Sequence, residues 1–167
     1  MISIKKLEKN QIDIIVESFK NENWFKERKL FEIYLKEQNE GKRIVYCVFY
    51  NDLFCGYGTL KYQSNYRYFS NFNIPEISDL NVLPKYRKKG IASILLNILE
   101  SEAFVVSKVV GIGVGLYSDY GSAQKLYVNR NYIPDGHGIT YNYESVTPGS
   151  QVILDDDLVL WFIKVKK

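Results

Sequence analysis

Residues Glu76 to Ser93 read EISDLNVLPKYRKKGIAS, a strand followed by a turn and the start of a helix. Apolar side chains alternate with polar ones up to Val82, which predicts a strand, and Pro84 ends it. A basic turn follows, and a helix is predicted to begin at Gly90. Because glycine allows a close backbone approach and the first amides of a helix lack partners within it, this segment is predicted to attract an anion.

The basic turn resembles the R-x-x-G-x-G/A signature of the GNAT superfamily of acetyltransferases, in the residues Arg87, Lys88, Lys89, Gly90, Ile91 and Ala92. It also follows a strand and opens an amphipathic helix, which is the context that the family requires. Lys88 and Ala92 stand where family members often carry glycine, so the turn here is bulkier. The resemblance implies that the turn binds the pyrophosphate of acetyl-CoA. The alternative is a solvated basic turn that caps an ordinary helix.

The order of elements resembles the GNAT fold over nearly the whole chain. The resemblance implies an α/β protein with a mixed central sheet of about seven strands flanked by helices. Strands four and five of that fold are parallel and splayed, and the pantetheine of the coenzyme lies in the gap. Backbone groups of the fourth strand would hold the coenzyme and the oxyanion, and the first helical turn would hold phosphate, through Leu80, Asn81, Val82 and Ser93.

Hydrophobic periodicity predicts the other elements. Strands are expected at residues 2–6, with one face buried, at 43–50, 53–62, 108–116 and 158–165, and a further strand begins at 131; helices are expected at 11–19, 24–38, from 90 onward and at 120–129. Residues 63–73 and 135–157 are predicted to be irregular. Gly56 and Gly58 fall on one face of their strand, where close packing or a ligand would need the missing side chain. Trp24 is interpreted either as a wall of an acceptor site or as a contact between two helices.

Length and composition predict one domain over residues 1–167, with 46% hydrophobic residues to form its core. A net charge of +3 does not favour a nucleic-acid partner, and no metal is expected. Cys47 and Cys55 lack metal spacing and are predicted to be buried free thiols. Without a signal peptide or an apolar run of about 18–20 residues, we expect a cytoplasmic protein that does not bind a membrane.

Acetyl transfer to an amine needs a proton donor for the leaving thiolate. The segment from Tyr120 to Tyr132 resembles the family's second motif, which implies that the Tyr127 hydroxyl faces the coenzyme sulfur. The alternative is a core tyrosine on a helix face. Tyr120 stands where the family often has an asparagine that contacts pantetheine, and the resemblance implies a coenzyme contact at this position. Arg130 is placed either to contact the 3′-phosphate or to cap the helix.

The reaction also needs a base, because an acceptor ammonium with a pKa of about 10.4 must lose a proton. Glu76 lies eleven positions before Arg87, which resembles the offset of the general base in histone acetyltransferases. Asp79 is the competitor, since it resembles an acidic position near the acceptor in polyamine acetyltransferases. The other readings are a surface Glu76 with a water that relays the proton, and His137, the single histidine.

These patterns predict a GNAT-type N-acetyltransferase that moves an acetyl group directly from acetyl-CoA to a primary amine. A small polyamine-like or aminoglycoside-like acceptor comes first, because Glu76, Asp79 and the acidic residues 155–157 attract a cation. A protein amino terminus is the second acceptor class. A coenzyme-binding sensor without catalysis is the alternative from another class. A homodimer is left open.

Overall fold

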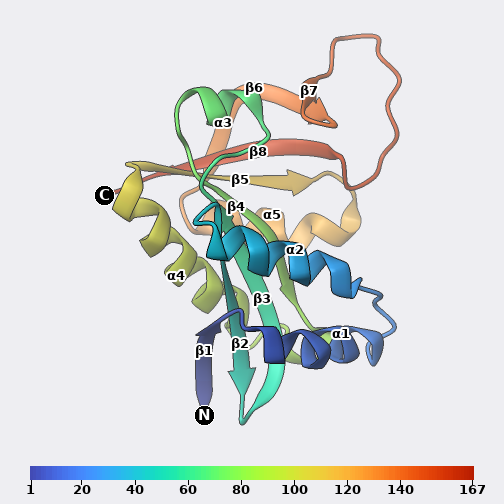
Figure 1. The fold of residues 1–167 in the computed structure, drawn as a ribbon. Coiled ribbons are helices and arrows are strands. Elements are labelled where there is room, and N and C mark those ends of the chain that lie inside the picture. The colour runs from blue at the N-terminus through green and yellow to red at the C-terminus, as the bar shows by residue number, and fades with distance from the viewer. The chain divides into compact units, whose positions relative to one another are not determined.

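The chain folds as two units, and the computed structural model describes all of residues 1–167. The first unit contains residues 1–61 and 77–102, and the second contains residues 62–76 and 103–167. Figure 1 labels the helices and strands of both.

The first unit is built on strands in the order β1-β2-β3-β4. Their bounds are β1 Ile2–Lys6, β2 Arg43–Tyr50, β3 Leu53–Lys61 and β4 Glu76–Val82, of which Glu76 belongs to the second unit. β1 pairs antiparallel with β2, and β2 and β3 form the predicted antiparallel hairpin. Ile2 and Ile4 are 44% and 40% exposed, so the prediction of a buried face on β1 is wrong, because this strand lies at the edge.

Helices cover both faces of this sheet. Side chains alternate along β3, so the neighbouring residues Tyr57 and Gly58 face opposite sides of the sheet. Tyr57 contacts the rings of Phe19 and Phe31, which belong to α1 Ile12–Lys20 and α2 Arg28–Asn39. A Cβ at Gly58 would lie 2.9 Å from Leu99, which belongs to α4 Ile91–Val106. At Gly56 it would lie 2.4 Å from the Asn81 carbonyl oxygen. Both glycines therefore serve close packing, which was one of their two predicted uses.

The second unit contains four strands in the order β5-β8-β6-β7, and Figure 1 shows the long connection between β7 and β8. Their bounds are β5 Val109–Gly115, β6 Ile133–Tyr141, β7 Glu144–Ser145 and β8 Leu158–Val165, and the helices are α3 Arg67–Asn71 and α5 Gly121–Asn129. β8 pairs antiparallel with both β5 and β6.

Aromatic rings fill the spaces left by the glycines of β5. A Cβ at Gly111 would meet the ring of Phe69, and one at Gly115 would meet the ring of Tyr120. Trp161 stacks on Tyr66 with 4.4 Å between ring centroids, and these rings form a buried core with Phe69. The glycine alternation in β5 is therefore a packing feature of this unit.

Two segments predicted to be irregular contain regular structure. Residues 63–73 include α3, which has only five residues, too few for helical periodicity to indicate, and buries Phe69. Residues 135–157 include most of β6 and all of β7. The turn signals of Gly136 and Gly138 are genuine, since both have positive φ, but the pairing of β6 with β8 absorbs them as a register shift.

Candidate functional site

The basic turn has the backbone that a phosphate site needs. β4 ends at Val82, a 3₁₀ turn spans Pro84–Tyr86, and α4 begins at Ile91. Gly90 has a φ of +80°, and a Cβ there would meet no atom within 4 Å, so the backbone is open to a ligand. The first helical hydrogen bond runs from the Ile94 N–H to the Gly90 carbonyl at 3.0 Å. Because the amides of the first turn precede that bond, they are available to an anion.

Four cationic residues, Lys85, Arg87, Lys88 and Lys89, precede these amides in the chain. The Lys85 ammonium lies 3.4 Å from Glu22, which joins the turn to the connection between α1 and α2. The Arg87 guanidinium lies 5.8 Å from the centre of the Trp24 ring, and its Nε donates to the Val82 carbonyl at 3.2 Å. Trp24 also contacts Phe19 of α1 edge to face, and its two interpretations stay predictions. The turn therefore fits a diphosphate, with Arg87 held beside it.

The glycine that the family often carries at the position of Lys88 has a physical explanation. Lys88 has a φ of +58°, the left-handed region that favours glycine. The turn keeps this left-handed conformation although a lysine, and not a glycine, is at position 88. Lys88 therefore adds a positive charge to the turn at a cost in backbone energy of roughly 1 kcal/mol.

Asp79 is the most heavily bonded carboxylate of the first unit. It interrupts β4 with a φ of +50° and accepts hydrogen bonds from Tyr34 at 2.9 Å, from Asn81 at 2.6 Å and from Tyr57. The Lys26 ammonium lies 3.2 Å from it. Burial alone would raise the pKa of Asp79, but Lys26 and the hydrogen bonds outweigh it and hold the pKa below its usual value. A low pKa favours a role in binding cations over a role as base.

The two tyrosines that bond Asp79 are themselves fixed in the core. Burial and the Asp79 charge raise the pKa of both Tyr34 and Tyr57, so both remain proton donors. The buried Arg43 guanidinium lies 4.2 Å from the centre of the Tyr34 ring and donates to Thr59. Sequence reasoning missed Lys26, Tyr34 and Tyr57, which lie on three separate segments of the chain.

Glu76 is only 5% exposed and accepts a hydrogen bond from the Ser64 hydroxyl. The same hydroxyl oxygen accepts the Tyr66 N–H at 3.0 Å. This burial argues against the alternative of a surface carboxylate. His137, the other candidate base, lies on β6 with its ring 4.1 Å from that of Tyr68.

Tyr127 lies on α5, 5% exposed, with its ring centre 5.9 Å from that of Tyr132. Burial raises the pKa of Tyr127, so the hydroxyl keeps its proton at neutral pH. Tyr120 donates to Asp156 at 2.7 Å and its ring lies against Gly115. Arg130 follows α5, and its N–H closes the last helical turn on Tyr127 and Leu126.

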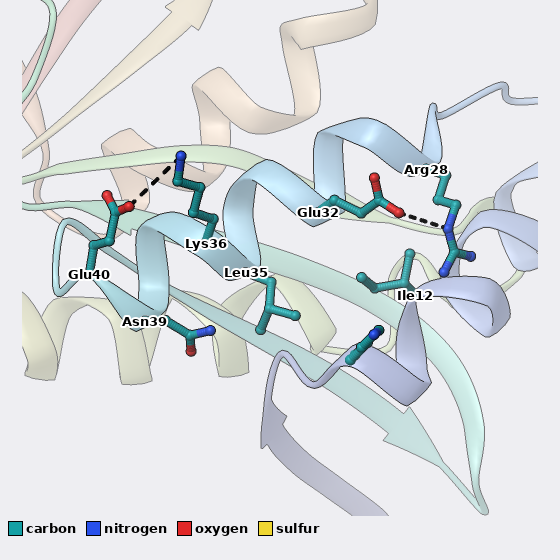
Figure 2. Close-up of a pocket in the computed structure, with 8 residues that line it drawn as sticks. Ile12, Arg28, Glu32, Leu35, Lys36, Asn39 and Glu40 are labelled. Carbon is teal, nitrogen blue, oxygen red and sulfur yellow. Dashed lines mark hydrogen bonds and ion pairs between the residues drawn. The ribbon is translucent and has the colours of Figure 1, made fainter.

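A separate open pocket of about 480 Å³ lies between α2 and the segment that precedes α1 (Figure 2). Figure 2 shows an ion pair at each end of its α2 wall, Arg28 with Glu32 and Lys36 with Glu40, and Leu35 between them. Lys9, Ile12 and Asn39 complete its lining. None of the residues predicted for the site lines this pocket.

The two cysteines are buried and free, as predicted. Burial raises the pKa of the Cys47 thiol to about 12, which leaves it protonated. No group of three or more metal-ligating side chains is present, and no helix has the length and apolarity to span a bilayer.

Solved structures with the same fold include several acetyltransferases. The chain is similar to an N-acetyltransferase from Staphylococcus aureus Mu50, with a TM-score of 0.72 and 17% identity over 100% of this chain and 99% of that one. It is similar to the yncA acetyltransferase of Salmonella typhimurium, solved with acetyl-CoA, with a TM-score of 0.69 and 17% identity over 99% and 94%. It is also similar to the spermidine N-acetyltransferase of Vibrio cholerae, solved with CoA and spermine, with a TM-score of 0.68 and 16% identity over 99% and 95%. No curated protein matches the sequence.

These likenesses confirm the predicted fold class, an α/β protein with a mixed sheet flanked by helices, with eight strands where about seven were predicted. The predicted splay of β4 from β5 stays a prediction. The model of the Acetyltransferase (GNAT) family matches residues 11–132, which include the basic turn and Tyr127. This match confirms the predicted family and, with it, acetyl-CoA as the acetyl donor. The chain belongs to the GNAT family of acetyltransferases.

Proposed function

We propose that this protein transfers an acetyl group from acetyl-CoA directly to a primary amine of a small molecule. The turn between Pro84 and Ile91 supports the proposal most strongly. It combines a left-handed Gly90, the open amides of α4 and a set of cations on one short segment. That combination suits the pyrophosphate of a coenzyme better than a neutral ligand.

The chemistry divides among three groups. The amine nitrogen attacks the thioester carbonyl carbon, the carbon–sulfur bond breaks, and the sulfur leaves as a thiolate. Tyr127 gives its phenolic proton to that thiolate. Glu76, directly or through a water, takes the proton that the amine loses. Backbone N–H groups of Leu80 to Val82 stabilise the oxyanion.

Transfer proceeds without a covalent enzyme intermediate. A cysteine nucleophile needs a low pKa and access to the substrate, and Cys47 has neither, because it is buried and its pKa is raised. Burial also raises the pKa of the Cys55 thiol. The amine itself is therefore the nucleophile in the proposed reaction.

The acceptor class follows from charge. Asp79 keeps a negative charge at neutral pH because its pKa is lowered, so a cationic amine suits the first unit. A small polyamine-like or aminoglycoside-like amine is the proposed acceptor, and a protein amino terminus is the second candidate. A coenzyme-binding sensor without catalysis is the competing function.

Free-thiol release from acetyl-CoA, measured with a panel of amines, tests the proposal. The panel contains diamines, aminoglycosides and a peptide with a free amino terminus. Tyr127→Phe should lower kcat on the order of 100-fold while coenzyme still binds, because a general acid contributes about that much. Tyr50→Phe is the matched control, since Tyr50 is 47% exposed at the end of β2. Coenzyme binding without thiol release for any amine would replace the enzyme by the sensor.

Several expectations stay predictions. They are the single domain, the cytoplasmic location, a homodimer, and the lack of nucleic-acid or membrane partners. Sedimentation of the purified chain with and without acetyl-CoA measures its oligomeric state.

A further inference from the structure

The Lys26 ammonium lies in a cluster of three aromatic rings and one carboxylate, called the recess below. Its Nζ is 5.5 Å from the centre of the Trp24 ring, 5.8 Å from that of Tyr57 and 5.9 Å from that of Phe19. The Asp79 carboxylate lies 3.2 Å away. Rings within about 6 Å of a cation attract it through their electron-rich faces, and a carboxylate adds a full opposite charge. The recess therefore has the chemistry of an ammonium-binding site.

The walls of the recess are rigid. Phe19 and Tyr57 are fully buried, and both pack edge to face against each other. Asp79 is held by three neutral hydrogen-bond donors besides Lys26, from Tyr34, Tyr57 and Asn81. These bonds fix the carboxylate whether or not Lys26 is present, so the site is preformed.

The occupant, by contrast, is a side chain that can leave. Lys26 lies in the connection between α1 and α2, outside both helices, on a flexible four-carbon stem. Its side chain is 17% exposed and that of Asp79 is 23% exposed, so both side chains reach solvent. Withdrawal of Lys26 would open Asp79 to solvent without disturbing the buried rings.

We propose that the recess of Phe19, Trp24, Tyr57 and Asp79 binds an ammonium group of the acceptor, and that Lys26 occupies this site until the acceptor displaces it. This inference rests on the proposed function and adds the place where the acceptor is held. The Arg87 guanidinium lies near the Trp24 ring, so the recess borders the turn that is proposed to bind phosphate.

The ammonium held here is not the one that reacts. An ammonium beside an ionised carboxylate is stabilised in its charged form, and the attacking amine must be neutral. The acceptor therefore carries at least two amino groups, one anchored at Asp79 as a cation and one free to lose its proton. A diamine fits this requirement, and a monoamine does not.

Calorimetric titration with 1,4-diaminobutane at fixed ionic strength tests the site without acetyl-CoA. Lys26→Met removes the competing ammonium and should tighten binding on the order of tenfold, the gain expected if Lys26 fills the site about nine-tenths of the time. Lys29→Met is the matched control, since Lys29 is exposed on α2 and should leave the affinity unchanged. Asp79→Asn should abolish binding with or without Lys26.

Circular dichroism of each variant establishes that it is folded. A folded Lys26→Met protein that binds the diamine no more tightly than the wild type overturns the proposal. The proposal is also overturned if Asp79→Asn binds 1,4-diaminobutane as tightly as the wild type does. In the thiol-release assay, 1-aminobutane should be a poorer acceptor than 1,4-diaminobutane. Equal kcat/KM values for the two amines would contradict the proposal that a second amino group is anchored at Asp79. If the recess binds 1,4-diaminobutane as described but no amine releases thiol from acetyl-CoA, the proposed function is wrong and the proposed ammonium site is still supported.

Discussion

The phosphate turn and the recess around Asp79 both lie in the first unit, but they are built in opposite ways. The turn is one continuous segment, residues 84–91, whose proposed function depends on backbone amides, positive φ and nearby cations. The recess is assembled from side chains of α1, β3, β4 and the connection that holds Lys26, and Tyr34 of α2 supports its carboxylate. One site is local in sequence and the other is tertiary.

This difference predicts how each site responds to mutation. In the turn, the proposed phosphate ligand would be held mainly by backbone groups, so substitutions there should act through φ and charge and leave the core intact. In the recess, Phe19 and Tyr57 are both walls of the site and part of the core, so substituting them should cost stability as well as binding. The loss of binding and the loss of stability can be measured separately for each variant.

The largest effect is expected from Asp79→Ala. It leaves the Lys26 ammonium and the hydroxyls of Tyr34 and Tyr57 without their shared acceptor, and should lower the free energy of unfolding by about 3 kcal/mol. Urea denaturation measures it. Asp119→Ala is the control, since Asp119 is exposed and should change stability by less than about 0.5 kcal/mol. A similar loss in both variants would show that the recess is not a stabilising network.

Acid should remove part of that stability. Because the pKa of Asp79 is lowered in the folded protein, its contribution is complete above the unfolded value of about 3.9 and is lost as pH falls below it toward the folded value. The gap in unfolding free energy between the wild type and Asp79→Asn should therefore be constant from pH 7 to about pH 5 and shrink by pH 3. A gap that does not change with pH contradicts the ionised carboxylate.

The sequence predicted the turn and missed most of the recess for the same reason. Six contiguous residues from Arg87 to Ala92 carry the turn, and a pattern of residue types can be matched there directly. Asp79 was named as a candidate, but its partners Lys26, Tyr34 and Tyr57 are separated from it by 22 to 53 positions. Only the fold brings them together.

Backbone conformation limited the prediction in a similar way. Alternation along a regular strand would put Glu76 and Asp79 on opposite faces, and the positive φ of Asp79 interrupts that alternation. α3 was missed because its five residues are held by the burial of Phe69. Long periodic elements, such as α4 and the β2–β3 hairpin, were predicted correctly.

Gly90→Ala separates backbone cost from ligand loss. Gly90 and Gly41 both have positive φ, +80° and +71°, and neither has an atom within 4 Å of an added Cβ. Alanine at either position should lower the free energy of unfolding by about 1 kcal/mol. Only Gly90→Ala should also weaken the binding of CoA, by about tenfold, because its Cβ enters the space that the phosphates need. Calorimetry with CoA measures this, and equal affinity in both variants would move the phosphate site elsewhere.

The smallest effect is expected from Lys88→Gly, and its sign is the informative part. Glycine relieves the left-handed strain at a φ of +58° but gains entropy in the unfolded chain, so the net stabilisation should be about 0.5 kcal/mol. Lys89→Gly is the matched control, because it removes the same charge from a residue whose φ is not positive, and it should destabilise by a similar amount. Both variants should bind CoA more weakly at low salt, and the difference should disappear as salt screens the lost charge. If Lys88→Gly destabilises the protein as much as Lys89→Gly does, the left-handed backbone at Lys88 is not a source of strain, and the family's glycine there needs another explanation.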